Sequence, residues 1–191
     1  MHQSLFGLSV LFVAGCGQAT PSSIAERPRA AEAGGPPPTA VAPVALCGPK
    51  EPGEKLAFGG RVLDYQGRPL PKAAVVAYNA DRAGLYVPPD SGTRVPRLRG
   101  AAVTDDLGQF RFATVRPGPY PGGDEPAHIH LVVTAPAHRP RFVTYWFEGD
   151  PLITPPKREK AARDPEMVIV PLARDPAGAW VFAHDIRLEA D

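Results

Sequence analysis

The chain has 191 residues, which is enough for one domain with a hydrophobic core and not comfortably for two. Its 21 basic and 20 acidic residues give a formal net charge of +1 without any long block of like charge, so nothing points to nucleic acid or an acidic polymer as a partner. The 19 glycines and 25 prolines favour short strands joined by many turns over a helical protein.

The N-terminus carries a short apolar run, residues 5–14, which is too short to span a bilayer stably and suits the core of a signal peptide. The next residues, Val13-Ala14-Gly15-Cys16, resemble the bacterial lipobox, in which the cysteine is diacylated and becomes the new N-terminus. We therefore predict that residues 1–16 are a signal peptide with a lipobox, although the first four residues contain no Lys or Arg. The predicted location is the cell envelope, with a lipid anchor on Cys16 as the only membrane contact; the alternative is a periplasmic or secreted protein.

Residues 17–47 are rich in Pro, Ala, Gly and Ser and show no sustained hydrophobic period. Such a segment buries little apolar surface, so we predict a disordered tether, followed by one folded domain over residues 48–191. Two cysteines, Cys16 and Cys47, do not make a disulfide scaffold, and we interpret Cys47 as an unpaired thiol.

Short runs rich in β-branched and aromatic residues follow the tether, with turn residues between them. Residues 109–115 alternate well, with Phe110 and Phe112 on one face. Two longer segments, 79–99 and 116–126, are dense in Pro and Gly, and loops of such length are usually functional or disordered. The pattern predicts an all-β fold, a single β-sandwich of about eight short strands with long active-site loops. The predicted strands are residues 56–63, 73–78, 101–104, 109–115, 127–134, 141–147, 166–172 and 179–188.

The strand AHIHLVVT is the most informative of these. Side chains alternate along a strand, so His128 and His130 share one face, while Ile129, Leu131 and Val133 share the other and can pack into the core. Two imidazoles at positions i and i+2 can converge on one first-row metal ion. The histidine face is expected to point away from the core, toward a site formed by the two long loops.

A His-x-His pair alone is weak evidence for a metal site. The cupin family also uses it after a Gly at the spacing that Gly122 has to His128. That family then requires a Glu a few residues later, and residues 131–137 contain none, so the cupin interpretation fails.

The segment Arg116-Pro-Gly-Pro-Tyr120-Pro-Gly, followed by Pro126-Ala-His128-Ile-His130-Leu-Val-Val, resembles the iron-binding segment of the intradiol ring-cleavage dioxygenases. This family comprises the protocatechuate 3,4-dioxygenase and catechol 1,2-dioxygenase enzymes. Tyr86 ends the segment Asn79-Ala-Asp-Arg-Ala-Gly84-Leu-Tyr86, where the family places its first tyrosine ligand. The resemblance covers about residues 56–155 in detail. Further matches are Gly60-Arg-Val-Leu-Asp64, Gly67-Arg-Pro-Leu70, Asp105-Asp106-Leu-Gly108-Gln-Phe110-Arg-Phe112 and Phe147-Glu-Gly-Asp-Pro151.

The resemblance implies a non-haem Fe(III) held by Tyr86, Tyr120, His128 and His130. Tyrosinate is a hard anionic donor that favours Fe(III), and coordination lowers the phenol pKa far below its ordinary value of about 10. The implied substrates are a catechol-type aromatic diol and O2, and the ring opens between the two hydroxyl-bearing carbons. In the family the tyrosine of the Pro-Gly-Pro-Tyr turn leaves the iron and takes a substrate proton, so Tyr120 is the expected catalytic base.

Two positions depart from the family pattern. Characterised members carry an Arg just before the Pro-Ala-His-Ile-His block, where this chain has Glu125, and a Gln near the start of the Phe-Glu-Gly-Asp-Pro block, where it has Thr144. Arg116, Arg139 and Arg141 are candidates for a replacement cation.

Two alternatives stay open. One is a metal-binding relative that has lost turnover. The other is a binding module, because the Gly-x-Val-x-Asp and Asp-Asp-x-Gly-x-Phe-x-Phe patterns also resemble the carboxypeptidase-regulatory and transthyretin-like sandwiches, which lack the His-x-His pair. The exact substrate and the oligomeric state stay open too. Three other tyrosines and two other histidines are expected to be packed or exposed without a role in chemistry: Tyr65, Tyr78, Tyr145, His138 and His184.

Overall fold

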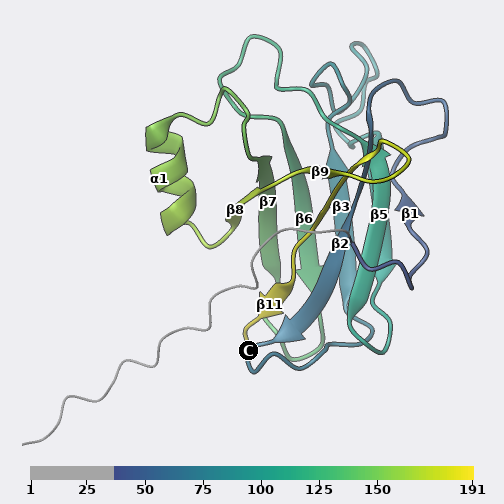
Figure 1. The fold of residues 1–191 in the computed structure, drawn as a ribbon, viewed down its shortest axis with the longest axis vertical. Helices are drawn as coiled ribbons and strands as arrows, with labels where there is room; N and C mark the ends of the chain where they lie inside the picture. The colour runs from purple at the N-terminus through teal and green to yellow at the C-terminus, as the bar shows by residue number, and fades with distance from the viewer. Residues whose placement is uncertain (1–36) are drawn as a thin grey trace, which may run out of the picture.

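A computed structural model describes residues 37–191, which form two β-sheets packed face to face and one short helix, α1, Pro155–Arg163 (Figure 1). The strands are β1 Val44–Ala45, β2 Lys55–Asp64, β3 Ala74–Asn79, β4 Leu98–Val103, β5 Gln109–Val115, β6 His128–Thr134, β7 Arg141–Phe147, β8 Met167–Val170, β9 Ala173–Arg174, β10 Trp180–Ala183 and β11 Ile186–Leu188. One sheet has the order β1-β5-β2-β10-β9, with β11 also on β2, and the other has the order β4-β3-β6-β7-β8. The predicted all-β sandwich is confirmed.

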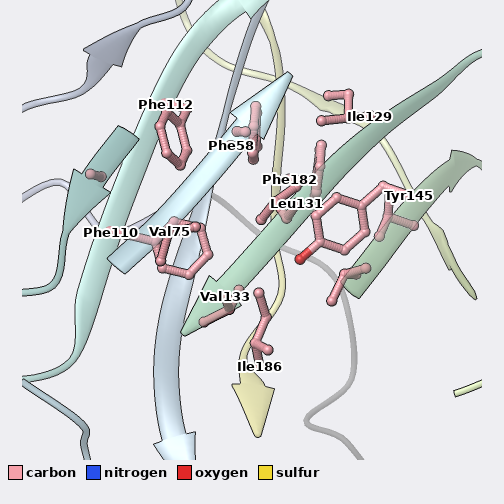
Figure 2. Close-up of a cluster of buried hydrophobic side chains, with 14 of the residues drawn as sticks. Phe58, Val75, Phe110, Phe112, Ile129, Leu131, Val133, Tyr145, Phe182 and Ile186 are labelled. Atoms are coloured by element: carbon pink, nitrogen blue, oxygen red, sulfur yellow. The ribbon is translucent and has the colours of Figure 1, made fainter. Parts of the chain in front are cut away.

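The core lies between the two sheets and is built from their alternating inward side chains (Figure 2). Phe58 of β2 stacks between Phe112 and Phe182, with ring centroids 5.4 and 5.3 Å apart. The opposing sheet contributes Tyr145 of β7 and the aliphatic face of β6, whose three side chains are at most 1% exposed. Strand β6, which carries both histidines, therefore packs its opposite face against a rigid aromatic and aliphatic core. The aliphatic residues of that face are Ile129, Leu131 and Val133.

The folded domain begins earlier than predicted, because residues 44–46 of the expected tether belong to the first sheet. β1 pairs in parallel with β5, and the Leu46 N–H donates to the Ala113 carbonyl at 2.9 Å. Leu46 is 3% exposed and packs in the core. Gly100 makes room for it, since a Cβ at this glycine would lie 2.9 Å from Leu46 Cδ2. The boundary predicted at residue 48 was wrong because a short strand in a Pro- and Ala-rich segment leaves no periodic signal.

The predicted strand 179–188 is two strands, β10 and β11, both parallel to β2. They are interrupted where Gly60 approaches the chain so closely that a Cβ there would collide with the His184 carbonyl. The His184 N–H donates to the Gly59 carbonyl, and the Asp185 carboxylate accepts from the Arg61 N–H. These contacts replace the regular ladder at residues 184–185, and the register with β2 is the same on both sides of the break.

Helix α1 was not predicted, because it has no apolar stripe to reveal it. Two prolines occupy its first turn, where a missing N–H costs nothing, and Ala161 is its only buried residue. It lies against the β8 edge of the second sheet (Figure 1).

No helix within residues 37–191 is long and apolar enough to cross a membrane. The predicted signal peptide and lipobox, residues 1–16, and the tether up to residue 36 lie outside the described residues.

Candidate metal centre

The candidate centre begins on the outer face of the second sheet. The registers place His130 directly opposite Tyr78 of β3 and opposite Thr144 of β7. Residues paired in this way point to the same side of a sheet. Tyr78, His130 and Thr144 therefore form a cross-strand row that faces away from the core, as the alternation of β6 predicted.

Two loops at the upper end of the sandwich in Figure 1 bring the tyrosines to this row. Tyr86 lies on the β3–β4 loop and Tyr120 on the β5–β6 loop. The loops pack tightly against each other, since a Cβ at Gly84 would collide with the carbonyl of Pro119. Gly84 also has a φ of 80°, which other residues adopt only with strain. The glycine thus permits the close approach that holds both phenols in place.

The donor atoms of three of the four predicted ligands lie within hydrogen-bonding distance of one another. The Tyr120 hydroxyl oxygen lies 2.9 Å from His128 Nε2 and 3.0 Å from the Tyr86 hydroxyl oxygen. The Tyr86 oxygen lies 3.2 Å from the same nitrogen. The fourth, His130, completes the cluster with its ring centroid 4.6 Å from that of His128. The structure thus brings all four predicted residues together.

Both imidazoles are oriented by hydrogen bonds on the nitrogen that faces away from the cluster. His128 Nδ1 lies 2.7 Å from the Pro126 carbonyl oxygen, which can only accept, so Nδ1 carries the proton. His130 Nδ1 lies 3.1 Å from the Thr144 hydroxyl oxygen. In each ring Nε2 is left as the nitrogen for a ligand, which is the usual orientation of metal-binding histidines.

The donor spacing fits a single metal ion. Two donors bound to one first-row metal at about 2 Å each lie roughly 3 Å from each other. The three measured separations, 2.9, 3.0 and 3.2 Å, match that requirement. Within residues 37–191 no group of three or more His, Cys, Asp or Glu side chains could hold a metal. A metal centre on these histidines therefore needs the two phenols, a donor pair suited to a highly charged cation.

Burial sets the protonation of the cluster. It raises the pKa of Tyr86 and of Tyr120, and it lowers the pKa of His130 to about 4. His130 is therefore neutral at pH 7 and has its lone pair available. A bound cation would offset the burial effect on the phenols by stabilising their anions.

Sequence reasoning missed two contributors to this site. Tyr78 was expected to be a packing residue, but its ring centroid lies 4.9 Å from that of His130 and 6.0 Å from that of Tyr86. Thr144 was noted only as a departure from the family, yet it is the partner of His130. The alternation of side chains along β3 and β7 could have predicted that Tyr78 and Thr144 point to the outer face. Only the strand register, which the sequence does not give, places them beside His130.

The three arginines considered as replacement cations lie elsewhere. Arg141 pairs with Val133 at the far end of β6 and donates to the Pro165 carbonyl, so it and the neighbouring Arg139 are at the opposite end of the sandwich. Arg116 lies over the Trp180 ring, 5.3 Å from its centroid. The hypothesis that one of them replaces the family arginine in the site is wrong.

The two remaining histidines in the described residues are outside the cluster, as expected. His184 is 5% exposed, and its Nδ1 lies 3.1 Å from the Tyr145 hydroxyl in the core. His138 Nδ1 lies 2.8 Å from the Pro136 carbonyl oxygen, in the turn between β6 and β7.

Comparison with known proteins identifies the family. The profile of a family described as Dioxygenase matches residues 35–190. The chain belongs to the intradiol dioxygenase family. It is 37% identical over 112 residues to the protocatechuate 3,4-dioxygenase beta chain of Burkholderia cepacia (53% of this chain, 48% of the relative) and 31% identical over 117 residues to the catechol 1,2-dioxygenase of Acinetobacter baylyi (52% and 38%). The chain thus spans about half the length, or less, of these curated relatives.

Solved structures of the family share the fold. Catechol 1,2-dioxygenase from Acinetobacter sp. ADP1 superposes with a TM-score of 0.62 at 26% identity, covering 76% of this chain and 56% of the other. The dioxygenase domain of a dioxygenase carbohydrate-binding protein fusion from Streptomyces sp. SirexAA-E superposes with a TM-score of 0.61 at 25% identity, covering 82% and 95%. The chain therefore matches nearly the whole of that dioxygenase domain.

Proposed function

We propose that the protein is a non-haem Fe(III) intradiol dioxygenase that uses O2 to cleave a catechol-type ring between its two hydroxyl-bearing carbons. One observation carries the proposal: donor atoms of Tyr86, Tyr120 and His128 lie 2.9–3.2 Å from one another, with the His130 ring beside them. The relatives support the substrate class, because they are named for protocatechuate, catechol and hydroxyquinol.

Tyr86, Tyr120, His128 and His130 would hold the iron. When bound, ferric iron would hold the two phenolic oxygens of the substrate and make its ring reactive toward O2. The protein would determine the position of the iron, and through it the position of the substrate oxygens. Pro126 and Thr144 orient the two imidazoles, and the packed loops hold the two phenols.

Tyr120 is the proposed general base. Burial favours the neutral phenol over the tyrosinate at this position, so a tyrosinate oxygen that does not contact a cation readily accepts a proton. The tyrosinate oxygen accepts a proton from a substrate hydroxyl and becomes a neutral phenol. In the overall reaction the bond between the two hydroxyl-bearing carbons breaks and both atoms of O2 enter the dicarboxylic acid product. No external reductant is consumed.

The test is oxygen uptake by the iron-loaded protein with catechol and no added reductant. We expect equal amounts of O2 and catechol to disappear and a ring-opened dicarboxylate to form. His128→Ala should abolish this activity. The matched control, His138→Ala, removes a histidine at the far end of β6 and should retain it.

Two outcomes would contradict the proposal in different ways. Iron binding with a catechol-dependent colour change but no oxygen uptake identifies a metal-binding relative without turnover. Folded protein that never takes up iron identifies a binding sandwich of the carboxypeptidase-regulatory or transthyretin-like kind.

A further inference from the structure

Glu125 is an acidic side chain at the candidate site without a cationic partner. It lies in the β5–β6 loop, three residues before His128, and is half-buried. Lys157 of helix α1 contacts the adjacent Asp124 instead, with its Nζ 3.6 Å from the carboxylate. Within residues 37–191 no salt bridge or side-chain hydrogen bond involves the Glu125 carboxylate.

The charge of Glu125 reaches the donor cluster. Burial raises the pKa of Tyr86 and of Tyr120, and the negative charge of Glu125 raises both further. Of the charged side chains in the part of the chain that the structure describes, Glu125 is the one that acts on the Tyr120 hydroxyl in this way. Glu125 lies on the same loop as Tyr120, between this residue and His128, so its charge borders the place where a substrate hydroxyl meets Tyr120.

No salt bridge within residues 37–191 pairs Glu125 with an arginine or lysine. Arg116 lies over Trp180, and Arg141 lies at the far end of the sandwich. Arg99 is opposite Tyr78 on strand β4, so the Tyr78 ring stands between it and His130. The Glu125 carboxylate is accordingly an unpaired negative charge on the loop that carries Tyr120.

We propose that Glu125 determines specificity and that the site fits catechols whose ring substituent carries an ammonium group, followed by neutral ones, and disfavours those that carry a carboxylate. The inference rests on the proposed function, because it assumes that a catechol binds at the Tyr86, Tyr120, His128 and His130 cluster. A half-buried carboxylate beside a bound ligand is expected to change the binding of a charged substituent of either sign by about tenfold after solvent screening.

The experiment measures dissociation constants without O2, from the change in visible absorption when a catechol is added to the iron-loaded protein. Three ligands differ mainly in charge: 4-(2-aminoethyl)catechol, 4-ethylcatechol and 3,4-dihydroxyphenylacetate. The variants are Glu125→Gln and Asp124→Asn. Asp124 is the matched control because it is the adjacent acid but has a side chain that is 96% exposed.

In the unmodified protein we expect the ammonium ligand to bind at least about tenfold more tightly than the carboxylate ligand, and this ratio should fall as salt is raised. Glu125→Gln should bring the ratio close to one, whereas Asp124→Asn should leave it within roughly twofold of the unmodified value. Tightest binding of the carboxylate ligand, or an equal ratio in the unmodified and Glu125→Gln proteins, overturns the inference and leaves the proposed function intact. Absence of any spectral change with 4-ethylcatechol overturns both.

Discussion

The Nδ1 atom of His130 lies 3.1 Å from the hydroxyl oxygen of Thr144, across the pairing of β6 with β7. This contact fixes the ring of a proposed iron ligand from behind. Hydrogen bonds of this kind typically affect metal affinity by about tenfold to a hundredfold.

Thr144→Val removes the hydroxyl and keeps the side-chain shape, so we expect it to weaken iron retention about tenfold or more, while Thr144→Ser retains the iron. The measurement is iron release to a competing chelator, followed through the visible absorption. Thr134→Val is the control, because Thr134 is an exposed threonine at the other end of β6. Equal iron retention in the Val and Ser variants of residue 144 would mean that Thr144 does not position His130.

His184 should make stability depend on pH. Burial lowers its pKa to about 4, and the positive charge of Arg141 acts in the same direction. In the unfolded chain the pKa is about 6.5, so the unfolded state binds a proton first as the pH falls. Stability contributed by neutral His184 is thus complete above about pH 6.5 and is lost progressively toward pH 4.

Between pH 7.5 and pH 5 this residue alone should lower the free energy of unfolding by about 2 kcal/mol. Urea unfolding at both pH values measures it, with His184→Gln as the comparison. The variant should lose less stability on acidification than the unmodified protein. The same pH dependence in both proteins would show that His184 is not the titrating group.

The early start of the domain gives a third prediction. Leu46→Ala removes a buried side chain beside Gly100 and should cost about 2–4 kcal/mol of stability. Leu107→Ala, at an exposed leucine, should cost less than about 0.5 kcal/mol. Urea unfolding midpoints compare the two, and equal midpoints would mean that β1 does not belong to the cooperative unit.

Attachment to a membrane is the fourth prediction. We propose that Cys16 carries the lipid anchor, because it ends a lipobox-like segment. Two acyl chains hold a protein on a membrane stably, whereas one chain does so only marginally, so loss of the diacylated cysteine should release the protein. Cys16→Ser in the full chain should move the protein from the membrane fraction to the soluble fraction. Unchanged fractionation would leave only the signal-peptide interpretation of residues 5–14.

Much of the fold could be predicted because its signal is local. The alternation in β6 separates two histidines from three aliphatic residues, and the structure places them on opposite faces as expected. The four candidate ligands could be named because the segments that contain them resemble those of the intradiol dioxygenases, and three of the four lie within residues 120–130. The structure then brings Tyr86 to the same cluster from a separate loop.

What could not be predicted depends on contacts between distant segments. Leu46 belongs to the core only because Gly100 leaves space for it. The break at His184 exists because Gly60, more than a hundred residues earlier, approaches its carbonyl. Thr144 is beside His130 only through the strand register.

The most direct measurement of the central claim is the iron content and visible spectrum of the domain over residues 37–191, expressed with sufficient iron. The account predicts about one iron per chain and a tyrosinate-to-iron charge-transfer band that disappears in His130→Ala and persists in His138→Ala. A colourless protein that contains zinc or no metal, or a band that His138→Ala removes as fully as His130→Ala, would contradict it.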